Sequence, residues 1–261
     1  MSTVGPAPTG PPARIVSLVP SITETVAHFG LLASLVGRTR HCTEPAGRVE
    51  AIETVGGTKN PDCGRIVQLA PDLVIVNKEE NRLEDYRVLV EAGLRVHVTH
   101  PRSVAEAISM IDELGIVLDV QAQARRLTAD CRRVLAAGGA VPQARPRVFC
   151  PIWRHPWMTF TDTTYIGDVL RSAGFDNVFG AEPGSDFFEV ELEEVRARAP
   201  ALVLLPDEPF VFEPAHGREL QSAGIDAPFL CLDGRDLSWY GPRIAMALPR
   251  LCAYRADHSR P

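Results

Sequence analysis

The chain of 261 residues lacks the features of several common protein classes. It has no run that approaches the ~18 apolar residues of a membrane-spanning helix, so we expect a protein that is not embedded in a membrane. Lysine is scarce, since Lys59 and Lys78 are the only two, and we interpret this as a compositional bias. The net charge of −6 argues against a nucleic-acid partner, because phosphate binding needs a concentrated basic face.

The N-terminal residues also lack the marks of a secretory signal. Residues 1–13 are rich in Pro, Gly, Ser and Thr and contain neither a basic n-region nor an apolar h-region. This composition predicts a disordered tail over 1–13. For the sequence as it stands we expect a cytoplasmic protein; a periplasmic or membrane-anchored extracytoplasmic location would follow if an upstream signal had been removed.

Signatures of disulfide frameworks and of catalysis are missing too. The six cysteines are scattered, with no C-x-x-C pair, which in a chain of this length predicts reduced core cysteines. The sequence holds no nucleophile elbow, H-E-x-x-H motif, P-loop or G-x-G-x-x-G after a predicted strand. We therefore predict a non-catalytic protein with no catalytic cofactor, and an enzyme is the least favoured alternative.

What the chain does contain is one α/β arrangement that occurs twice. A strand with a following helix, a helix–proline–strand unit and a glycine-terminated helix with a strand succeed one another within residues 14–100. The same three units recur within residues 147–234. Three pairs of equivalent residues are separated by nearly constant offsets of 132, 129 and 131: Val16 and Val148, Pro71 and Pro200, and Gly93 and Gly224. The repeat predicts two similar α/β lobes, over 14–102 and 140–261.

Residues 103–139, between the lobes, carry a helical pattern. Gly115 or Asp119 marks a break between two helices. A continuous helix from Asp119 to residue 137 would be ~28 Å long at 1.5 Å per residue. No flexible Gly/Ser linker joins the lobes, so we expect a stiff connection with a small hinge range.

Two Ser-x-x-Glu sequences fit capping boxes at helix starts. Ser21 and Glu24 follow the first predicted strand, and Ser103 and Glu106 begin the connecting segment. In such a box the serine hydroxyl accepts a hydrogen bond from the backbone N–H three residues later. We therefore expect a helix to begin directly after each serine.

All three tryptophans of the chain lie in segments that leave predicted strand ends. They are Trp153, Trp157 and Trp239. Loops at the carboxyl ends of parallel strands are where open α/β sheets bind ligands, and two facing lobes form a cleft of the kind that takes small molecules. We interpret the three rings as covering a ligand, and packing at a domain interface is the alternative.

Four runs resemble the vitamin B12-binding component of ABC importers: RIVSLVPSITET (14–25), VGGTKNPDCGRIVQLAPDLVI (55–75), AGLRVHVTHPRSVAEAI (92–108) and SWYGPRIAMALPRLC (238–252). That family belongs to the helical-backbone metal-receptor class of periplasmic binding proteins, which includes ferric siderophore and haem binders, and the similarity spans about Arg14 to Tyr254. The resemblance implies the class III fold, two Rossmann-like lobes with mostly parallel sheets joined by a long rigid backbone helix. It also implies non-catalytic ligand binding in the cleft between the lobes.

The resemblance assigns ligand-binding residues at matching positions. They are Pro20, Ser21, Ile22, His41, Trp153, His155, Trp157, Phe187, Arg235, Asp236, Trp239 and Tyr240. Stacking on aromatic rings, worth about 0.5–1.5 kcal/mol beyond burial, suits a large flat ligand. The expected ligand is a corrinoid such as cobalamin or another chelated metal, and a ferric siderophore or haem is the alternative. An enzyme that acts on such a chelate is the least favoured alternative.

Two departures from the family make the first lobe more polar. Thr58 replaces a tryptophan and Asn77 replaces another aromatic residue. Polar and charged residues surround these two positions: Lys59, Asn60, Lys78, Glu79 and Asn81. We expect the rim of the first lobe to be polar, so the identity of the ligand stays open.

The family implies a partner as well, because its importers use one exposed glutamate per lobe to dock on the ABC transporter permease. Glu193 matches the glutamate of the second lobe, whereas Gly64 stands at the position of the first. A cytoplasmic sensor or storage protein on the same fold is therefore a further alternative. We expect the protein to be a monomer.

A bare-metal binder is the remaining alternative. His41 lies beside Cys42 and Glu44, and His100 ends a predicted strand of the same lobe. A bare ion needs three or four converging N, O or S ligands. The VPSITE loop after the first strand offers no histidine, which weighs against this alternative.

Overall fold

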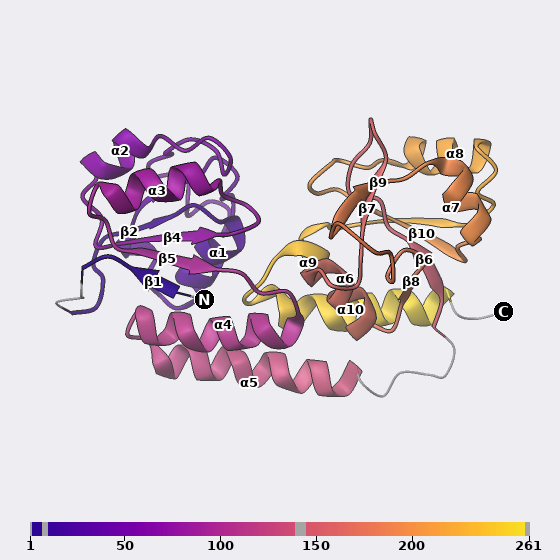
Figure 1. Cartoon of the computed structure of the whole chain (residues 1–261). Coiled ribbons are helices and arrows are strands. Elements are labelled where there is room, and N and C mark those ends of the chain that lie inside the picture. Colours follow the sequence, from indigo (N-terminus) through magenta and orange to yellow (C-terminus); the bar gives the residue numbers. More distant parts are fainter. Residues whose placement is uncertain (1, 7–9, 139–144, 259–261) are drawn as a thin grey trace. The chain divides into compact units, whose positions relative to one another are not determined.

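The computed structural model describes residues 2–6, 10–138 and 145–258, and the chain divides into two compact units (Figure 1). Unit 1 comprises Met1–Pro101, Ala107–Ala129 and Tyr240–Pro242. Unit 2 comprises Arg102–Glu106, Asp130–Trp239 and Arg243–Pro261. The predicted connecting segment 103–139 is therefore shared between the two units.

Unit 1 contains a five-stranded sheet in the order β1-β5-β4-β2-β3. Its strands are β1 (Ser2–Val4), β2 (Ile15–Ser17), β3 (Leu35–Arg38), β4 (Leu73–Asn77) and β5 (Val96–Thr99). Its shorter helices are α1 (Pro20–His28), η1 (Leu32–Ser34), α2 (Cys63–Gln68) and α3 (Leu83–Glu91). The strands β2 to β5 are parallel, and the central strand β4 is buried and apolar along its length, as in sheets covered on both faces.

The prediction of a disordered tail over 1–13 is wrong for residues 2–4. These residues form β1, which pairs antiparallel with β5, and Thr3 Oγ1 lies 2.8 Å from His97 Nδ1. The N–H and C=O groups on the edge of β5 would otherwise be unpaired, and backbone pairing can satisfy them with almost any sequence. Composition alone carries no information about such a partner.

Unit 2 contains a four-stranded parallel sheet in the order β11-β10-β6-β8 and a separate antiparallel pair of β7 and β9. Its strands are β6 (Arg147–Phe149), β7 (Met158–Phe160), β8 (Asp176–Asn177), β9 (Phe187–Glu189), β10 (Leu202–Pro206) and β11 (Phe229–Leu232). Its helices are α6 (Tyr165–Ser172), α7 (Leu192–Arg198), α8 (Pro214–Ser222), α9 (Arg235–Ser238) and α10 (Arg243–His258).

The two sheets share one topology, as the sequence repeat predicts. Without β1, the order β5-β4-β2-β3 of unit 1 corresponds strand for strand to β11-β10-β6-β8 of unit 2. The offset pairs support this correspondence, because Val16 lies in β2 and Val148 lies in β6. The predicted α/β fold with mostly parallel sheets is confirmed.

The connecting segment forms two helices, α4 (Val104–Val117) and α5 (Gln121–Gly138). The break falls at Asp119, which has a φ of 57°, one of the two positions that the sequence indicated. At the other, Gly115, an added Cβ would lie 2.4 Å from the Cβ of Ala124, so the glycine lets the two helices approach closely. Residues of both units occur in each of these helices.

One predicted capping box is wrong and the other is present in part. The helix α1 begins at Pro20, with Val19 as its N-cap and no side-chain cap, because proline at the first helical position is already set for the helix. In α4 the Ser103 hydroxyl does accept from Glu106 N, at 3.1 Å. The Glu106 carboxylate, however, accepts from Arg102 N, at 2.8 Å, rather than from the cap residue.

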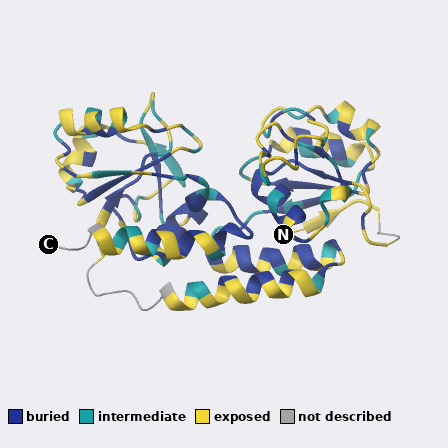
Figure 2. Cartoon of the chain, turned by 180° about the vertical axis from the view of Figure 1, so that it is seen from behind, coloured by how far each residue is buried: buried dark blue, intermediate teal, exposed yellow. Residues whose placement is uncertain are grey.

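Each unit has its own apolar core between its sheet and its helices, and in Figure 2 most strands are buried while the outward faces of the helices are exposed. The core of unit 1 is formed by Val16, Leu18, Val55, Ile66, Val74, Val76, Leu89 and Val96. The core of unit 2 is built around Phe149, Phe179, Val195, Val203, Leu205, Phe212 and Leu220. Among the described residues, no helix combines the length and the apolar character needed to cross a membrane.

Candidate functional site

The carboxyl end of the unit 2 sheet carries a group of packed rings that we call the aromatic cluster. Its members are Trp153, Trp157, Phe210, Phe212 and His216. They come from the segment after β6, the segment after β10 and the first turn of α8. Since β6 and β10 are neighbouring parallel strands, their carboxyl ends bring the first two segments together.

The rings of the aromatic cluster pack in a defined order. Trp157 stacks on the buried Phe212 with centroids 5.8 Å apart and an interplanar angle of 9°. Phe210 lies 4.7 Å from Phe212, and Trp153 meets Phe210 edge to face at 5.6 Å. Trp153 is the outermost ring and is 43% exposed, an unusual state for the largest apolar side chain.

Backbone and ionic contacts hold the segment that presents these tryptophans. Ile152 N donates to Met158 O at 2.9 Å and Met158 N donates to Trp153 O at 3.1 Å, which closes the segment into a narrow loop. The Arg154 guanidinium lies 5.7 Å from the centre of the Trp157 ring and binds both oxygens of Glu219 in α8, at 2.7 and 2.9 Å. The predicted residues Trp153, His155 and Trp157 thus share one loop.

Within that loop His155 is exposed, and its Nε2 atom contacts the Arg154 guanidinium. Arginine is always a donor, so this contact makes Nε2 the acceptor of the ring. The His155 backbone has a φ of 67°, an uncommon conformation for a residue that is not glycine. The side chain therefore projects from a turn and not from a strand.

Trp239 lies in a different environment from the other two tryptophans. It is only 6% exposed, and the Arg243 and Arg235 guanidinium groups lie 5.0 and 6.0 Å from its ring. Its Nε1–H donates to Glu208 Oε2 at 2.9 Å, and its carbonyl accepts from the Tyr165 hydroxyl at 3.2 Å. This ring packs within unit 2 and offers little free surface to a ligand.

Glu208 links two strand-end segments of unit 2. Burial raises the pKa of its carboxyl group, which the hydrogen bond from Trp239 and the charge of Arg235 offset in part. An added Cβ at Gly234 would lie 2.6 Å from Glu208 N, so the segment after β11 passes directly against the segment after β10. Only glycine allows this close approach.

The remaining predicted residues of unit 2 are engaged inside the unit. Arg235 binds both oxygens of Asp233, at 2.8 and 2.9 Å, and these bonds hold the pKa of Asp233 below its usual value although burial opposes ionisation. Asp236 is buried and accepts from Arg250 Nε at 2.7 Å. Phe187 is half-buried in β9, opposite Phe160 of β7.

At the carboxyl end of the unit 1 sheet, the predicted residues Pro20, Ser21 and Ile22 form the first turn of α1 and are buried. His41 is exposed in the loop after β3, and partial burial together with the charge of Arg40 lowers its pKa. Tyr240 is buried and belongs to unit 1, whereas the adjacent Trp239 belongs to unit 2. The structure thus groups the predicted residues into two sets, one in each unit.

The expected polar rim of unit 1 is only partly present. Asn77 and Asn81 are buried, and the prediction that Asn81 lies at the rim is wrong. Its amide joins three segments, since Oδ1 accepts from Asn77 N at 2.7 Å while Nδ2 donates to Leu18 O at 3.2 Å and to Thr58 O at 3.0 Å. Lys59, Asn60 and Lys78 are exposed as expected.

No group of three or more His, Cys, Asp or Glu side chains that could hold a metal ion occurs in the part of the chain that the structure describes. Of the residues considered for a bare ion, Cys42 is buried, and burial raises the pKa of its thiol. None of the six cysteines forms a disulfide. A bare-metal site over His41, Cys42 and Glu44 gains no support from this geometry.

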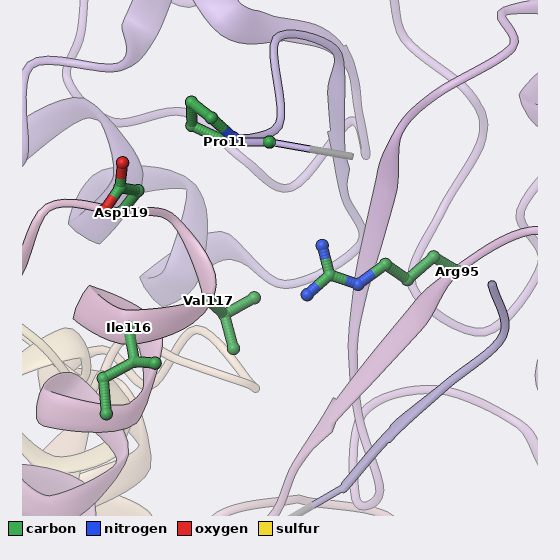
Figure 3. A pocket seen from close by; sticks show the side chains of 6 residues that line it. Pro11, Arg95, Ile116, Val117 and Asp119 are labelled. Carbon is green, nitrogen blue, oxygen red and sulfur yellow. The ribbon is translucent and has the colours of Figure 1, made fainter. Parts of the chain in front are cut away.

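A hollow of about 370 Å³ lies away from these strand ends (Figure 3). Its lining consists of Gly10, Pro11, Arg95, Ile116, Val117 and Asp119, all of unit 1. Arg95 directly precedes β5 and extends toward Val117, so the hollow is at the amino end of that strand. It contains none of the predicted ligand-binding residues, and parallel sheets bind ligands at the opposite edge.

Four residues near the unit 2 strand ends were not among the predicted ligand-binding residues: Glu208, Phe210, Phe212 and His216. The segment after β10 includes the first three, and its two phenylalanines at alternate positions after a strand were an available signal. His216 had no comparable signal, because its place against Phe210 and Phe212 depends on how α8 packs.

Of the two positions considered for docking on a permease, Glu193 carries a carboxylate and Gly64 has no side chain. Glu193 lies in the first turn of α7, is exposed, and forms no hydrogen bond or ion pair through its side chain with another described residue. Its neighbour Glu194 instead pairs with Arg198 at 3.1 Å. Gly64 lies in the first turn of α2, where Asp62 caps the helix by accepting from Arg65 N at 2.8 Å.

Comparison with known families and proteins relates this chain to binding proteins. A family model described as periplasmic binding protein matches residues 15–216. The vitamin B12-binding protein of Pectobacterium carotovorum is 22% identical over 246 residues, which are 93% of this chain and 88% of that protein. An uncharacterized ABC transporter substrate-binding lipoprotein of Bacillus subtilis is 33% identical over 107 residues, 40% of this chain and 33% of that protein.

Solved structures with the same fold include binders of two different ligands. The periplasmic vitamin B12-binding protein of Vibrio cholerae has a TM-score of 0.80 at 21% identity, and the match covers 96% of this chain and 99% of that one. The periplasmic haem-binding protein of Roseiflexus sp. RS-1, in its apo form, has a TM-score of 0.84 at 22% identity and covers 96% and 100%. At this level of identity the likeness shows the fold alone.

Proposed function

Since the chain belongs to the periplasmic binding protein family, we propose that it is a non-catalytic binder of a corrinoid or another chelated metal, such as haem or a ferric siderophore. The names of its relatives include vitamin B12 binders, and structures of the same fold include haem binders. Each of these ligands is a large metal chelate with apolar surface. The corrinoids and haem are flat, and the ferric siderophores are compact. The chelate is cargo and not a catalytic cofactor.

The observation that carries this proposal is the aromatic cluster with its outermost ring exposed. Trp157, Phe210 and Phe212 support Trp153 from behind, so its orientation is set before any ligand arrives. A pre-oriented aromatic surface binds a planar partner without losing side-chain freedom. We assign the main apolar contact to Trp153, with Trp157, Phe210 and His155 beside it.

The other predicted residues differ in whether a partner in unit 2 already engages their polar groups. Pro20, Ser21, Ile22, His41, Phe187 and Tyr240 remain proposed ligand-binding residues. We give Arg235, Trp239 and Asp236 a supporting role, since Asp233, Glu208 and Arg250 already engage their polar groups. Their substitution would act on ligand binding through the segment that they hold in place.

The experiment that tests the proposal is a titration of the purified protein with cyanocobalamin, hemin and ferrichrome, followed by tryptophan fluorescence. The ligands absorb light, so the signal needs an inner-filter correction and a non-binding control protein. We expect saturable quenching by one of the three. Isothermal titration calorimetry then gives the affinity of each variant independently of fluorescence.

The variants separate stacking from general effects. Trp153→Ala should weaken binding about 2- to 10-fold, the equivalent of one lost stacking contact, while Trp153→Phe should retain most of the affinity. Met246→Ala is the matched control, because Met246 is an exposed apolar residue of α10 outside the aromatic cluster. No saturable binding of any chelate would refute the proposed function, and equal affinity of Trp153→Ala and the parent would refute the role of the cluster.

The proposed partner is an ABC transporter permease, with Glu193 as the contact of unit 2. Its exposed carboxylate is available for an arginine of the partner, whereas Gly64 offers none. We propose an extracytoplasmic location, because the names of relatives place them in the periplasm or describe a lipoprotein. A cytoplasmic sensor or storage protein is the second candidate, favoured by six cysteines that form no disulfide.

A further inference from the structure

The first turn of α1 holds three hydrogen-bond donors that lack an acceptor. Ser21 is 2% exposed, and its Oγ atom has no hydrogen-bond partner. The N–H groups of Ser21 and Ile22 also find no acceptor among the described residues, since the first helical bond of α1 runs from Thr23 N to Val19 O at 2.9 Å. Buried donors are nearly always satisfied in native proteins, so the three together indicate a missing partner.

The electrostatics of this helix start favour an anionic partner. The helix α1 has nine residues, no side-chain cap and no acidic residue in its first turn. The partial positive charge at its N-terminus is therefore not compensated within the helix. Because helical side chains lean toward the N-terminus, the Ser21 hydroxyl lies on the same side as the two free N–H groups, which is the arrangement that binds anionic oxygens.

The only two lysines of the chain lie in loops attached to this helix start. The Asn81 amide binds Leu18 O, just before α1, and Thr58 O, just before Lys59. Lys78 directly follows β4 in the same loop as Asn81, is exposed, and forms no hydrogen bond or ion pair through its side chain with a described residue. Lys59 Nζ donates to Glu79 O at 2.6 Å, so both lysines belong to one edge of unit 1.

We propose that the first turn of α1 binds an anionic oxygen of the chelated ligand through Ser21 Oγ and the N–H groups of Ser21 and Ile22. Lys59 and Lys78 lie in loops joined to this helix start, as do Glu79 and Glu80, so the proposal rests on the three donors and not on an excess of positive charge. This inference rests on the proposed function and narrows it to chelates that carry a carboxylate or a phosphate on their periphery. An uncharged chelate of the same size would leave the three donors unsatisfied.

Matched ligand pairs test the inference directly. Hemin is compared with its dimethyl ester, in which both carboxylates are masked, and cyanocobalamin is compared with dicyanocobinamide, which lacks the phosphate together with the ribose and the base. We expect the parent protein to bind the anionic member of one pair more tightly. The Ser21→Ala variant should weaken that member about 10- to 100-fold, as for a hydrogen bond to a charged group, and should leave its uncharged counterpart unchanged.

Two further variants control for structural effects. Ser21→Thr keeps the hydroxyl and should restore the preference for the anionic member. Ser222→Ala removes a hydroxyl that donates to Arg218 O on the exposed face of α8 and should change nothing. The midpoint of thermal unfolding of Ser21→Ala should not fall, because the lost hydroxyl has no partner in the protein. Equal weakening of both members of a pair, or of neither, overturns the inference while the proposed function stands.

An NMR titration tests anion binding at the first turn of α1 even if no chelate binds. In ¹⁵N-labelled protein, sodium propionate and sodium phosphate, each against sodium chloride at equal ionic strength, should shift the amide resonances of Ser21 and Ile22. The shifts should be lost in Ser21→Ala, and the stronger of the two anions identifies carboxylate or phosphate as the preferred group. Unshifted amides with both anions overturn the anion site, whereas shifted amides without chelate binding refute only the proposed function.

Discussion

Unit 1 and unit 2 place loops after topologically equivalent strands, yet the two strand-end edges are built from different chemistry. In unit 2 the segments after β6 and β10 meet through stacked rings, with Trp157 on Phe212. In unit 1 the segments after β2 and β4 meet through the buried amide of Asn81. A duplicated scaffold thus fixes where loops converge, and the residues in them decide whether the edge presents aromatic surface or hydrogen-bond donors.

The difference extends to buried ionisable groups. Unit 1 contains His97, which is 2% exposed and whose pKa is lowered to about 4, first by burial and then by positive charge that includes Arg95. Unit 2 contains Glu208, whose pKa is raised by burial. Both groups favour the neutral form, so the two units should respond to pH in opposite directions.

The largest expected effect is the acid sensitivity of unit 1. Because the pKa of His97 is about 4 in the folded chain and about 6.5 in an unfolded one, its contribution to stability is complete above pH 6.5 and lost as the pH falls toward 4. The loss amounts to about 3 kcal/mol at 1.36 kcal/mol per pKa unit. Urea unfolding between pH 7 and pH 4 measures it, and His97→Gln should flatten this part of the profile. An unchanged profile in the variant would show that other groups cause the acid sensitivity.

The next largest effect is expected at the polar junction of unit 1. Asn81→Ala removes three hydrogen bonds and leaves buried backbone groups without partners, which should lower the free energy of unfolding by about 3 kcal/mol. Asn60→Ala is the control, because Asn60 is an exposed amide of the neighbouring loop. Urea unfolding at pH 7 gives both values. A loss below about 1 kcal/mol would show that water replaces the amide.

The aromatic junction of unit 2 should separate stability from binding. Trp157→Ala removes a ring stacked on the core residue Phe212 and should cost about 2 kcal/mol of unfolding free energy, whereas Trp153→Ala, at an exposed position, should cost less than 1. Thermal unfolding and ligand titration of both variants test the contrast. Equal destabilisation by the two substitutions would mean that the cluster is one packing unit without a free face.

The smallest effect is expected at Glu208. A carboxyl group whose pKa is raised on folding loses stability as the pH rises from its unfolded value through its folded value. Glu208→Gln keeps an acceptor for Trp239 Nε1–H and removes the titration, so its advantage over the parent should be absent at low pH and present at neutral pH. Urea unfolding at pH 4 and pH 7 measures the difference. A variant that is less stable at both pH values would contradict this interpretation.

The sequence by itself determined the repeated α/β plan. Strand and helix patterns are local properties of the chain, so the offsets near 130 residues predicted two equivalent sheets, and the tryptophan-bearing loops after strands could be located. The helix break near Asp119 was also readable, since it depends on residues close in sequence.

Only the tertiary structure decided which of these residues are free. The Trp239 ring is covered by Arg243 and hydrogen-bonded to Glu208, and Asn81 turns inward to join three loops, although nothing in the local sequence distinguishes them from exposed neighbours. The strand β1 exists because β5 offers it an unpaired edge. Hydrogen bonds and ring contacts between residues far apart in the chain depend on how the elements pack, and local patterns do not encode that packing.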